Sequence, residues 1–491
     1  MAVDYDLVII GGTVEARYAA IAAARLHARV ALVEPTAECS AQRQSQVWNQ
    51  TLIQVGQVAQ QMRQVEALGL QWPASSSVES DPCHPLTVQW QTSLQRAQLA
   101  GSILDEARSP AILAAQGVDV IWGEGQFCHR PRLSFTVDQR RLTACAYLIA
   151  TGASPVIPNL TGLPTVDYLT PETLGQPNRI SQLPDRLVVI GGEPAGLELG
   201  QTWARLGVQV TILVKDAQLL PYADQEAAHL IQAQLEADGV RILTNTPVSQ
   251  IKQSQGQKWI QSGDQAVAAD AILLAVGWQP NLQQLNLEAV GIAWSHRGIR
   301  VNQKLQTTHP RIYACGAVLG GYPFTHLAEY EASIALKNAL FLPKFKVDYR
   351  GIPWAVLTTP ELARVGLTEA QARQRYGKHV WVLKQHFQTI GKAQISGHTN
   401  GFCKLIAHPS GTLLGAHIIG PDASELIHSM ALAIRQGLKI EAIAALPHIS
   451  TTLSVICAQA AMDWHKQRLQ RHSFCSDWLE NWFNLHRTWF H

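Results

Sequence analysis

The order of apolar and polar positions repeats one unit twice along the chain. The first copy covers residues 6–34 and the second covers residues 186–215. Each copy has a short apolar run, a pair of glycines (Gly11-Gly12 and Gly191-Gly192), a helical stretch and a second apolar run. This order is typical of a βαβ unit whose strands lie in a buried parallel sheet. The pattern therefore predicts two Rossmann-like units, each with a cleft of nucleotide size.

Further strands and turns indicate where the chain passes between domains. Apolar runs end in glycine at 147–152 and 271–277, which predicts crossings near 152 and 280. From about Val347 the pattern changes to short strands followed by a helix over 423–437, as in an α+β domain. We therefore expect an α/β protein with two Rossmann-like, three-layer dinucleotide-binding domains and a C-terminal α+β domain. The expected segments are 1–152, 153–282, 283–346, 347–463 and 464–491.

The last segment has an amphipathic pattern of its own. Trp478, Trp482, Leu485 and Trp489 are spaced so that they share one face of a helix. Such a face either packs against its own domain or a dimer partner, or it docks on a membrane surface or another protein. The sequence leaves these readings open.

Length, charge and cysteine usage narrow the class of protein. A chain of 491 residues is too long for a single hydrophobic core. The 39 basic and 37 acidic residues give a net charge of +2, which is no electrostatic footprint for nucleic acid. We find no basic leader and no run of about 18 apolar residues, so we expect a cytoplasmic protein. The eight cysteines are scattered without C-x-x-C or zinc-site spacing, which predicts free thiols and no metal centre.

Several further motifs follow the two units in order. They are Ala150-Thr151-Gly152, Tyr168-Leu169-Thr170, Gly196-Leu197-Glu198, Ala275-Val276-Gly277 with Pro280-Asn281, Ile312-Tyr313-Ala314-Cys315-Gly316, and Thr359-Pro360-Glu361-Leu362 with Val365-Gly366-Leu367-Thr368-Glu369. With these motifs the chain resembles the class I pyridine nucleotide-disulfide oxidoreductases, which include glutathione reductase, dihydrolipoamide dehydrogenase and mercuric reductase. The resemblance implies an FAD domain completed by segment 283–346, an NAD(P) domain, and a homodimer formed through segment 347–463.

The resemblance assigns the first glycine turn to FAD. In such a turn the first glycine permits the bend, the second admits the pyrophosphate and the third lets helix and strand pack closely. These positions are Gly11, Thr13 and Ala16, so a β-branched side chain stands where the phosphate would approach. The helix that begins after Gly12 still offers N–H groups to an anion. Glu34 ends the second strand, where its carboxylate can accept both ribose hydroxyls, and adenosine binding is expected to be intact.

Other expected flavin contacts lie later in the chain. They are Thr151, Gly152, Gly316, Ala317, Leu327 and Ala328. Family members carry an aspartate at the position of Ala317, where it holds the ribityl chain. Losing that acceptor costs about 1–3 kcal/mol. Leu327 and Ala328 belong to a helix that resembles the one whose N-terminus faces the flavin ring. We expect bound FAD, and the alternative is an empty or differently filled cleft.

The resemblance assigns the second glycine turn to NAD or NADP. The positions concerned are Gly191, Glu193, Gly196 and Gly277. Glu193 places a carboxylate close to a pyrophosphate, which it would repel. Glu198 matches a family carboxylate near the nicotinamide and flavin rings and is a candidate catalytic residue. Lys215 either pairs with the 2′-phosphate of NADP or is a solvated residue at a strand end.

The redox centre of the family is missing from this sequence. Ala41 and Gln46 align with its two cysteines, and Gln50 aligns with its lysine. Residues 450–455 align with the segment that supplies a His-Glu pair from the partner subunit, and both members are absent. We therefore expect the chain to be neither a disulfide nor a mercuric reductase.

Two hypotheses for the function follow. In the first, an FAD-dependent NAD(P)H oxidoreductase passes electrons from the flavin directly to a small acceptor such as a quinone or dye. In the second, a catalytically degenerate dimer keeps the clefts as a binding or assembly module and uses its tryptophan-rich tail as a contact surface. The electron acceptor is not given by the sequence.

Overall fold

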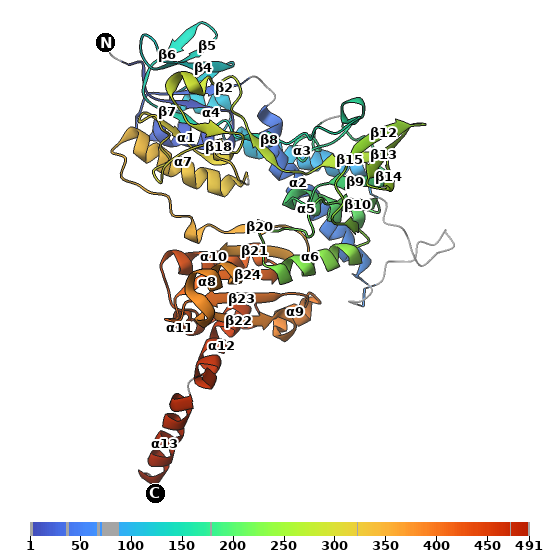
Figure 1. Cartoon of the computed structure of the whole chain (residues 1–491), viewed down its shortest axis with the longest axis vertical. Helices are drawn as coiled ribbons and strands as arrows, with labels where there is room; N and C mark the ends of the chain where they lie inside the picture. Colours follow the sequence, from blue (N-terminus) through green and yellow to red (C-terminus); the bar gives the residue numbers. More distant parts are fainter. Residues whose placement is uncertain are drawn as a thin grey trace. The chain divides into compact units, whose positions relative to one another are not determined.

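A computed structural model describes residues 3–35, 39–65, 69–70, 88–176, 179–321, 323–471 and 473–489. The chain divides into two compact bodies. The N-terminal body comprises Met1–Leu219 and Leu235–Val347, and the C-terminal body comprises Leu220–Gln234 and Asp348–His491. Each body has its own sheets (Figure 1) and its own core.

The first sheet of the N-terminal body is parallel and follows from the first sequence repeat. Its strand order is β19-β7-β1-β2-β3. The strands are β1 (Tyr5–Ile10), β2 (Val30–Glu34), β3 (Val118–Trp122), β7 (Ala144–Ile149) and β19 (Ile312–Ala314). Successive side chains of a strand point to opposite faces, so an apolar run such as 7–10 serves two cores at once.

Different elements cover the two faces of this sheet. Helices α1 (Val14–Arg25), α4 (Pro110–Ala115) and α7 (Thr325–Leu340) border one face, where Ala16 and Ala332 pack with Leu7 and Leu32. The small antiparallel sheet β4-β5-β6 (Gly125–Cys128, Ser134–Val137 and Arg140–Leu142) covers the other. The three-layer domain predicted from the sequence is present.

The second sequence repeat forms a second parallel sheet with strand order β11-β10-β9-β15. The elements are β9 (Arg186–Ile190), α5 (Pro194–Arg205), β10 (Gln209–Leu213), β11 (Arg241–Leu243) and β15 (Ala271–Leu274). An antiparallel sheet, β12 (Gln250–Ser254), β13 (Gln257–Ser262) and β14 (Gln265–Ala269), shares a core with it. Strands β8 (Ala153–Pro155) and β16 (Trp278–Pro280) pair where the chain crosses between the two domains.

Two long helices connect the two dinucleotide-type domains of the N-terminal body. Helix α2 (Cys39–Arg63) packs along α3 (Trp90–Glu106) and against α5. Gly56 permits the second contact, because a Cβ there would lie 3.1 Å from the Thr202 backbone. The Trp90 and Trp203 rings meet edge to face with centroids 5.8 Å apart. The side chains of Cys39 and Ala41, at the start of α2, lie outside the described residues.

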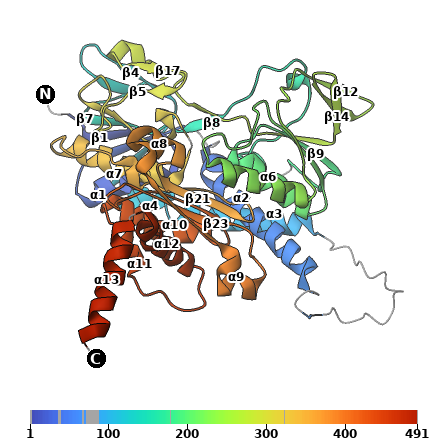
Figure 2. The same ribbon diagram turned by 60° about the horizontal axis from the view of Figure 1, so that its bottom comes forward.

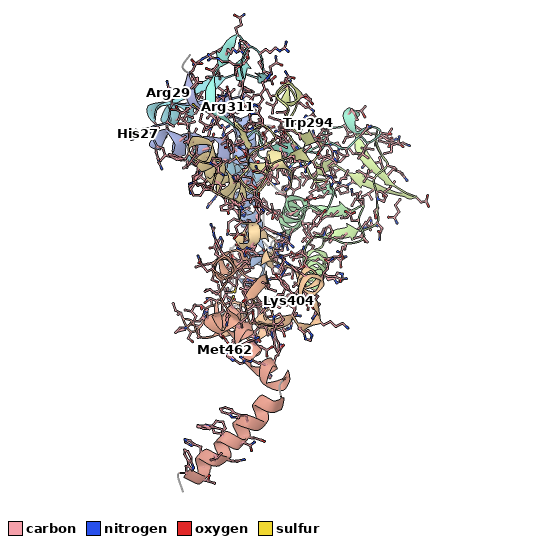
Figure 3. All side chains as sticks on the ribbon, turned by 60° about the vertical axis from the view of Figure 1, so that its left-hand side comes forward. His27, Arg29, Trp294, Arg311, Lys404 and Met462 are labelled. Carbon is pink, nitrogen blue, oxygen red and sulfur yellow. The ribbon has the colours of Figure 1, made fainter. Side chains whose placement is uncertain are left out.

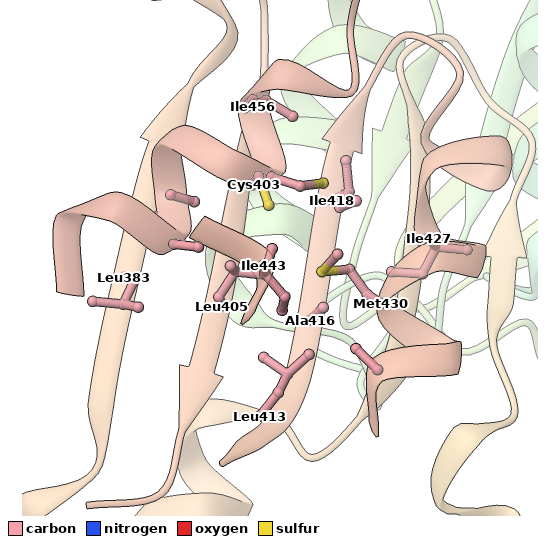
Figure 4. Close-up of a cluster of buried hydrophobic side chains, with 14 of the residues drawn as sticks. Leu383, Cys403, Leu405, Leu413, Ala416, Ile418, Ile427, Met430, Ile443 and Ile456 are labelled. Carbon is pink, nitrogen blue, oxygen red and sulfur yellow. The ribbon is translucent and has the colours of Figure 1, made fainter. Parts of the chain in front are cut away.

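The C-terminal body is an α+β fold around an antiparallel sheet with strand order β20-β21-β24-β23-β22. The strands are β20 (Trp354–Val356), β21 (Glu361–Gly366), β22 (Trp381–His386), β23 (Phe402–Ala407) and β24 (Leu413–Gly420). The helices are α6 (Gln225–Ala237, which begins in this body), α8 (Glu369–Tyr376), α9 (Gly391–Ser396), α10 (Ala423–Arg435), α11 (Ile440–Ala444) and α12 (Val455–Arg471) (Figure 2). Leu405 and Ile418 of the sheet pack against Ile427, Met430 and other helix residues (Figure 4).

The chain ends in helix α13 (Ser473–Trp489). Its tryptophans are exposed in this chain: Trp478 is 56%, Trp482 is 49% and Trp489 is 76% accessible. The Trp478 and Trp482 rings stack on one another with centroids 5.9 Å apart. Within the described part of the chain, we find no helix with the length and apolar character needed to span a bilayer.

Candidate nucleotide sites

The glycine turn of the first unit is closed by its own hydrogen bonds. Gly11 has φ +134°, and a Cβ there would lie 2.0 Å from the Ala150 carbonyl oxygen, so only glycine fits. Thr13 caps α1: its Oγ1 accepts from the Ala16 N–H at 3.2 Å and donates to the Ala150 carbonyl at 3.0 Å. Its hydroxyl therefore serves the turn itself, and Gly11, Gly12 and Thr13 are all buried.

The carboxylate assigned to the ribose is paired inside the protein. Arg17 of α1 donates from Nε to Glu34 Oε1 at 2.6 Å and from Nη2 to Oε2 at 2.9 Å. The Arg17 and Glu34 side chains are 1% and 0% exposed. Arg17 Nη1 also donates to the Arg108 carbonyl at 2.9 Å and contacts Asp105 at 3.3 Å. Glu34 ends β2, as predicted from the sequence. Arg17 was not predicted, because its only sequence signal is a charge in an alanine-rich helix.

A second carboxylate fills the space between α1 and the segment at Gly316. A Cβ at Gly316 would lie 2.4 Å from Glu15 Oε1. The Gly316 N–H donates to Glu331 Oε2 at 2.7 Å, and Ala317 beside it is buried. Burial, together with the Glu331 and Glu329 carboxylates, raises the pKa of Glu15 to about 7. Glu15, at the second position of α1, was not among the residues predicted from the sequence.

The elements expected around the flavin ring bond directly to each other. Thr325 Oγ1, at the start of α7, donates to Gln46 Oε1 of α2 at 2.6 Å. Leu327 is partly buried and Ala328 is buried on α7. Gln46, which we expected at the position of a redox cysteine of the family, is therefore joined to the N-terminal end of α7.

Thr151 and Gly152 lie at the crossing between the two domains. Thr151 Oγ1 donates to the Asn281 carbonyl at 2.7 Å, and Asn281 Nδ2 donates back to the Thr151 carbonyl at 3.1 Å. The Asn281 N–H donates to the Gly152 carbonyl at 3.0 Å. These bonds fix β8 against β16, so both residues have a structural role here.

The glycine turn of the second unit has the same backbone but stays accessible. Gly191 has φ +113° and lies as close to the Ala275 carbonyl as Gly11 does to Ala150, with 2.0 Å to an added Cβ. A Cβ at Gly196 would lie 2.6 Å from the Ala275 Cβ, so close helix–strand packing requires this glycine. Residues 191–195 are all partly exposed, whereas 11–13 and 15–17 are buried.

The charged residues predicted for this site lie in the turn or on the elements that follow it. Glu193 caps α5 without a side-chain cap bond, and burial, with a contribution from Asp216, raises the pKa of its carboxyl. Lys215 is exposed just after β10, and Glu198 is partly buried on α5. Gly277 has φ +119° with nothing within 4 Å of an added Cβ.

Residues 450–455, which we aligned with the segment that completes a partner's redox site, place hydroxyl groups next to His448. His448 Nδ1 lies 3.3 Å from Ser454 Oγ, and Ser454 Oγ lies 2.9 Å from Thr452 Oγ1. A hydroxyl orients the imidazole much more weakly than a carboxylate would.

Two dinucleotide-type domains followed by an α+β domain define a two-nucleotide oxidoreductase fold. Residues 5–332 match the family described as pyridine nucleotide-disulphide oxidoreductase, and residues 352–461 match its dimerisation domain. The chain belongs to this family.

Relatives and solved structures agree over most of the chain. It is 33% identical to mercuric reductase of Staphylococcus aureus, covering 89% of this chain and 78% of the relative. It is 31% identical to a dihydrolipoyl dehydrogenase of Bacillus subtilis (strain 168), covering 91% and 96%. The HOCl-induced flavoprotein disulfide reductase RclA from Escherichia coli, as its Cu(II) complex, superposes with TM-score 0.80 at 26% identity, covering 94% and 99%.

These findings correct one expectation and confirm two. The expectation that the chain is neither a disulfide nor a mercuric reductase was wrong, because a mercuric reductase and a flavoprotein disulfide reductase each match about nine-tenths of it. The expected family and fold class are confirmed. Family members are FAD-dependent and bind NAD(P), which is consistent with FAD and NAD(P) for this chain.

The residues present fit the two cofactors unequally. The second unit offers an accessible turn and an exposed lysine. In the first unit the positions for ribose, phosphate and ring are taken by Arg17 against Glu34, Glu15 against Gly316, and Gln46 against Thr325. As arranged in this structure, the first unit does not fit FAD.

Proposed function

We propose that this chain acts as a homodimeric binding module that takes a pyridine nucleotide as a ligand in its second dinucleotide unit. The observation that carries the proposal is the contrast between the two glycine turns. Residues 191–195 are all partly exposed, while 11–13 and 15 at the corresponding positions of the first unit are buried. An accessible turn at the N-terminus of a helix presents N–H groups and a positive dipole end to a pyrophosphate.

The phosphorylated nucleotide NADP is the form that the charges favour. Lys215 is exposed at the end of β10, the position from which a residue reaches the adenosine ribose. A cation there pairs with a 2′-phosphate, whereas an acidic side chain would accept from the 2′-hydroxyl of NAD. Glu193 opposes both nucleotides equally, because it faces the pyrophosphate that they share.

The family's dimerisation domain and helix α13 supply the assembly part of the proposal. Residues 352–461 match that domain, which supports a homodimer. On α13, Trp482, Leu485 and Trp489 are 49–76% exposed and share one face, as a protein-contact surface requires. Deleting residues 473–491 should abolish a larger assembly seen by light scattering but leave the dimer. Unchanged assembly, or loss only of vesicle binding, would contradict a protein contact.

Calorimetric titration of the full-length dimer with NADP and NAD tests the nucleotide site. We expect saturable binding that favours NADP, and Lys215→Glu should weaken NADP by about tenfold or more while sparing NAD. Lys252→Glu is the matched control, since Lys252 is exposed on β12 of the same domain. Absence of binding would contradict the proposal. So would steady NAD(P)H oxidation through a bound flavin with a quinone or dye as acceptor, which would support the enzyme hypothesis instead.

A further inference from the structure

We infer that Arg17 and Glu15 occupy the places of FAD in the first unit, so that this domain folds around built-in substitutes for its ligand. The inference concerns the first cleft and is independent of nucleotide binding in the second. Three separate contacts along the expected path of the cofactor support it.

At the ribose end, Arg17 does what a ribose diol does in the family. A diol donates two hydrogen bonds to the carboxylate that ends the second strand. Here the guanidinium donates two, at 2.6 and 2.9 Å, to the two oxygens of Glu34. A planar guanidinium matches a carboxylate in this way better than any other side chain. The arrangement leaves Glu34 0% exposed and therefore out of reach of a ligand.

Further bonds hold Arg17 in this position. Asp105 of α3 contacts Arg17 at 3.3 Å and accepts from Arg43 Nε at 2.8 Å. Arg43 in turn donates to the Gly12 carbonyl at 2.8 Å, within the glycine turn itself. The turn, α1, α2 and α3 are thus joined by one charged network in which every named member has a partner.

At the phosphate end, the Glu15 carboxyl group takes the place of a phosphate. The N-terminus of a helix stabilises an anion through its free N–H groups and dipole. Glu15 lies in the first turn of α1, is 6% exposed and has Oε1 against Gly316, the residue across the expected pyrophosphate path. Thr325 and Gln46 then join α7 to α2 at the ring end. A bound FAD would have to displace all three contacts.

Removing the substitutes should restore the cofactor site. The test variant combines Glu15→Ala, Arg17→Met and Ala317→Asp, which clears both positions and returns the acceptor for the ribityl chain. Full-length wild type and variant are titrated with FAD alone, following flavin fluorescence, and melted with and without FAD. We expect no saturable binding by wild type, binding of one FAD per chain by the variant, and a variant whose melting temperature rises when FAD is added.

Two further variants separate cofactor replacement from simple loosening. Arg205→Met breaks a pair with Asp238 that is also buried, at 5% exposure on each side, but lies outside the first cleft, so this variant should not bind FAD. Glu15→Ala alone clears the phosphate position and keeps the Arg17–Glu34 pair, and it covers the case in which the triple variant fails to fold. It should bind FAD more tightly than wild type. Equal FAD affinity in wild type and both cleft variants would overturn the inference.

Discussion

Arg17 and Glu34 form a two-bond ion pair, at 2.6 and 2.9 Å, that joins helix α1 to the end of strand β2 with both side chains buried. The pair lies where the family places the adenosine ribose. A buried pair of this kind contributes little net stability compared with apolar residues, but breaking it is costly because one charge is left without a partner. The pair therefore keeps the first cleft closed and makes its residues hard to substitute one at a time.

Replacing Arg17 alone should destabilise the first unit strongly. Arg17→Met leaves Glu34 buried and unpaired, so we expect a loss of about 3–5 kcal/mol in the free energy of unfolding, measured by urea denaturation. The matched control is Arg186→Met, since Arg186 pairs with Asp270 at 2.8 Å but both are about one-third exposed. Its cost should be much smaller, because solvent screens an exposed pair. Similar costs for the two variants would show that the Arg17 pair is not buried.

Glu15 should make folding stability fall as pH rises. Burial raises its pKa in the folded protein to about 7 from 4.5, so the folded state holds this proton more tightly than the unfolded state. The stabilisation is complete below about pH 4.5 and is lost as pH rises to about 7, by roughly 2–3 kcal/mol. Glu15→Gln should flatten the urea-derived stability over this range. A wild-type profile without this decline would argue against a buried carboxyl.

The fold was predictable from the sequence because its apolar residues recur at regular spacings. The closing of the first cleft was not predictable. Both βαβ units and the strands near 354 and 403 follow directly from apolar runs. Glu15 and Arg17, however, stand in an alanine-rich helix where a charge usually marks the solvent side. Their burial depends on Glu34 and Gly316, which are distant in sequence and adjacent only after folding. The accessibility of the second turn likewise has no signal in its glycine spacing.

Nucleotide affinity in the second unit should increase as pH falls. Burial, with a smaller contribution from Asp216, raises the pKa of Glu193, so its carboxyl loses its charge at a higher pH than usual. The neutral form no longer repels a pyrophosphate, and NAD, which has no 2′-phosphate to titrate, should bind more tightly at pH 5 than at pH 8. Glu193→Gln should bind NAD more tightly at pH 8 and remove the pH dependence. If the NAD affinity of the wild type did not change with pH, Glu193 would not lie next to the ligand.

The C-terminal body contains a buried ion pair between Lys404 and Asp224. Lys404 of β23, marked in Figure 3, donates to both oxygens of Asp224 at 2.9 Å, and each side chain is 7% exposed. Burial raises the pKa of Asp224, but the Lys404 hydrogen bond and charge outweigh it and hold that pKa below its ordinary value. The pair's contribution is therefore present at neutral pH and lost as pH falls through the lowered pKa.

Lys404→Met should cost about 3 kcal/mol or more of stability at pH 7, measured by urea denaturation of the dimer. Arg373→Met is the control, because Arg373 pairs with Glu369 at 2.8 Å on the exposed side of α8, and it should cost less than about 0.5 kcal/mol. Equal costs would remove the argument for burial of Lys404.

Equilibrium dialysis of the wild-type dimer against FAD and NADP together tests the central claim most directly, since both clefts are examined in the same molecules. We expect NADP to be retained and FAD to be lost, because Arg17 and Glu15 occupy the first cleft while the turn at 191–195 is open. Stoichiometric retention of FAD, with or without NADP, would contradict the account.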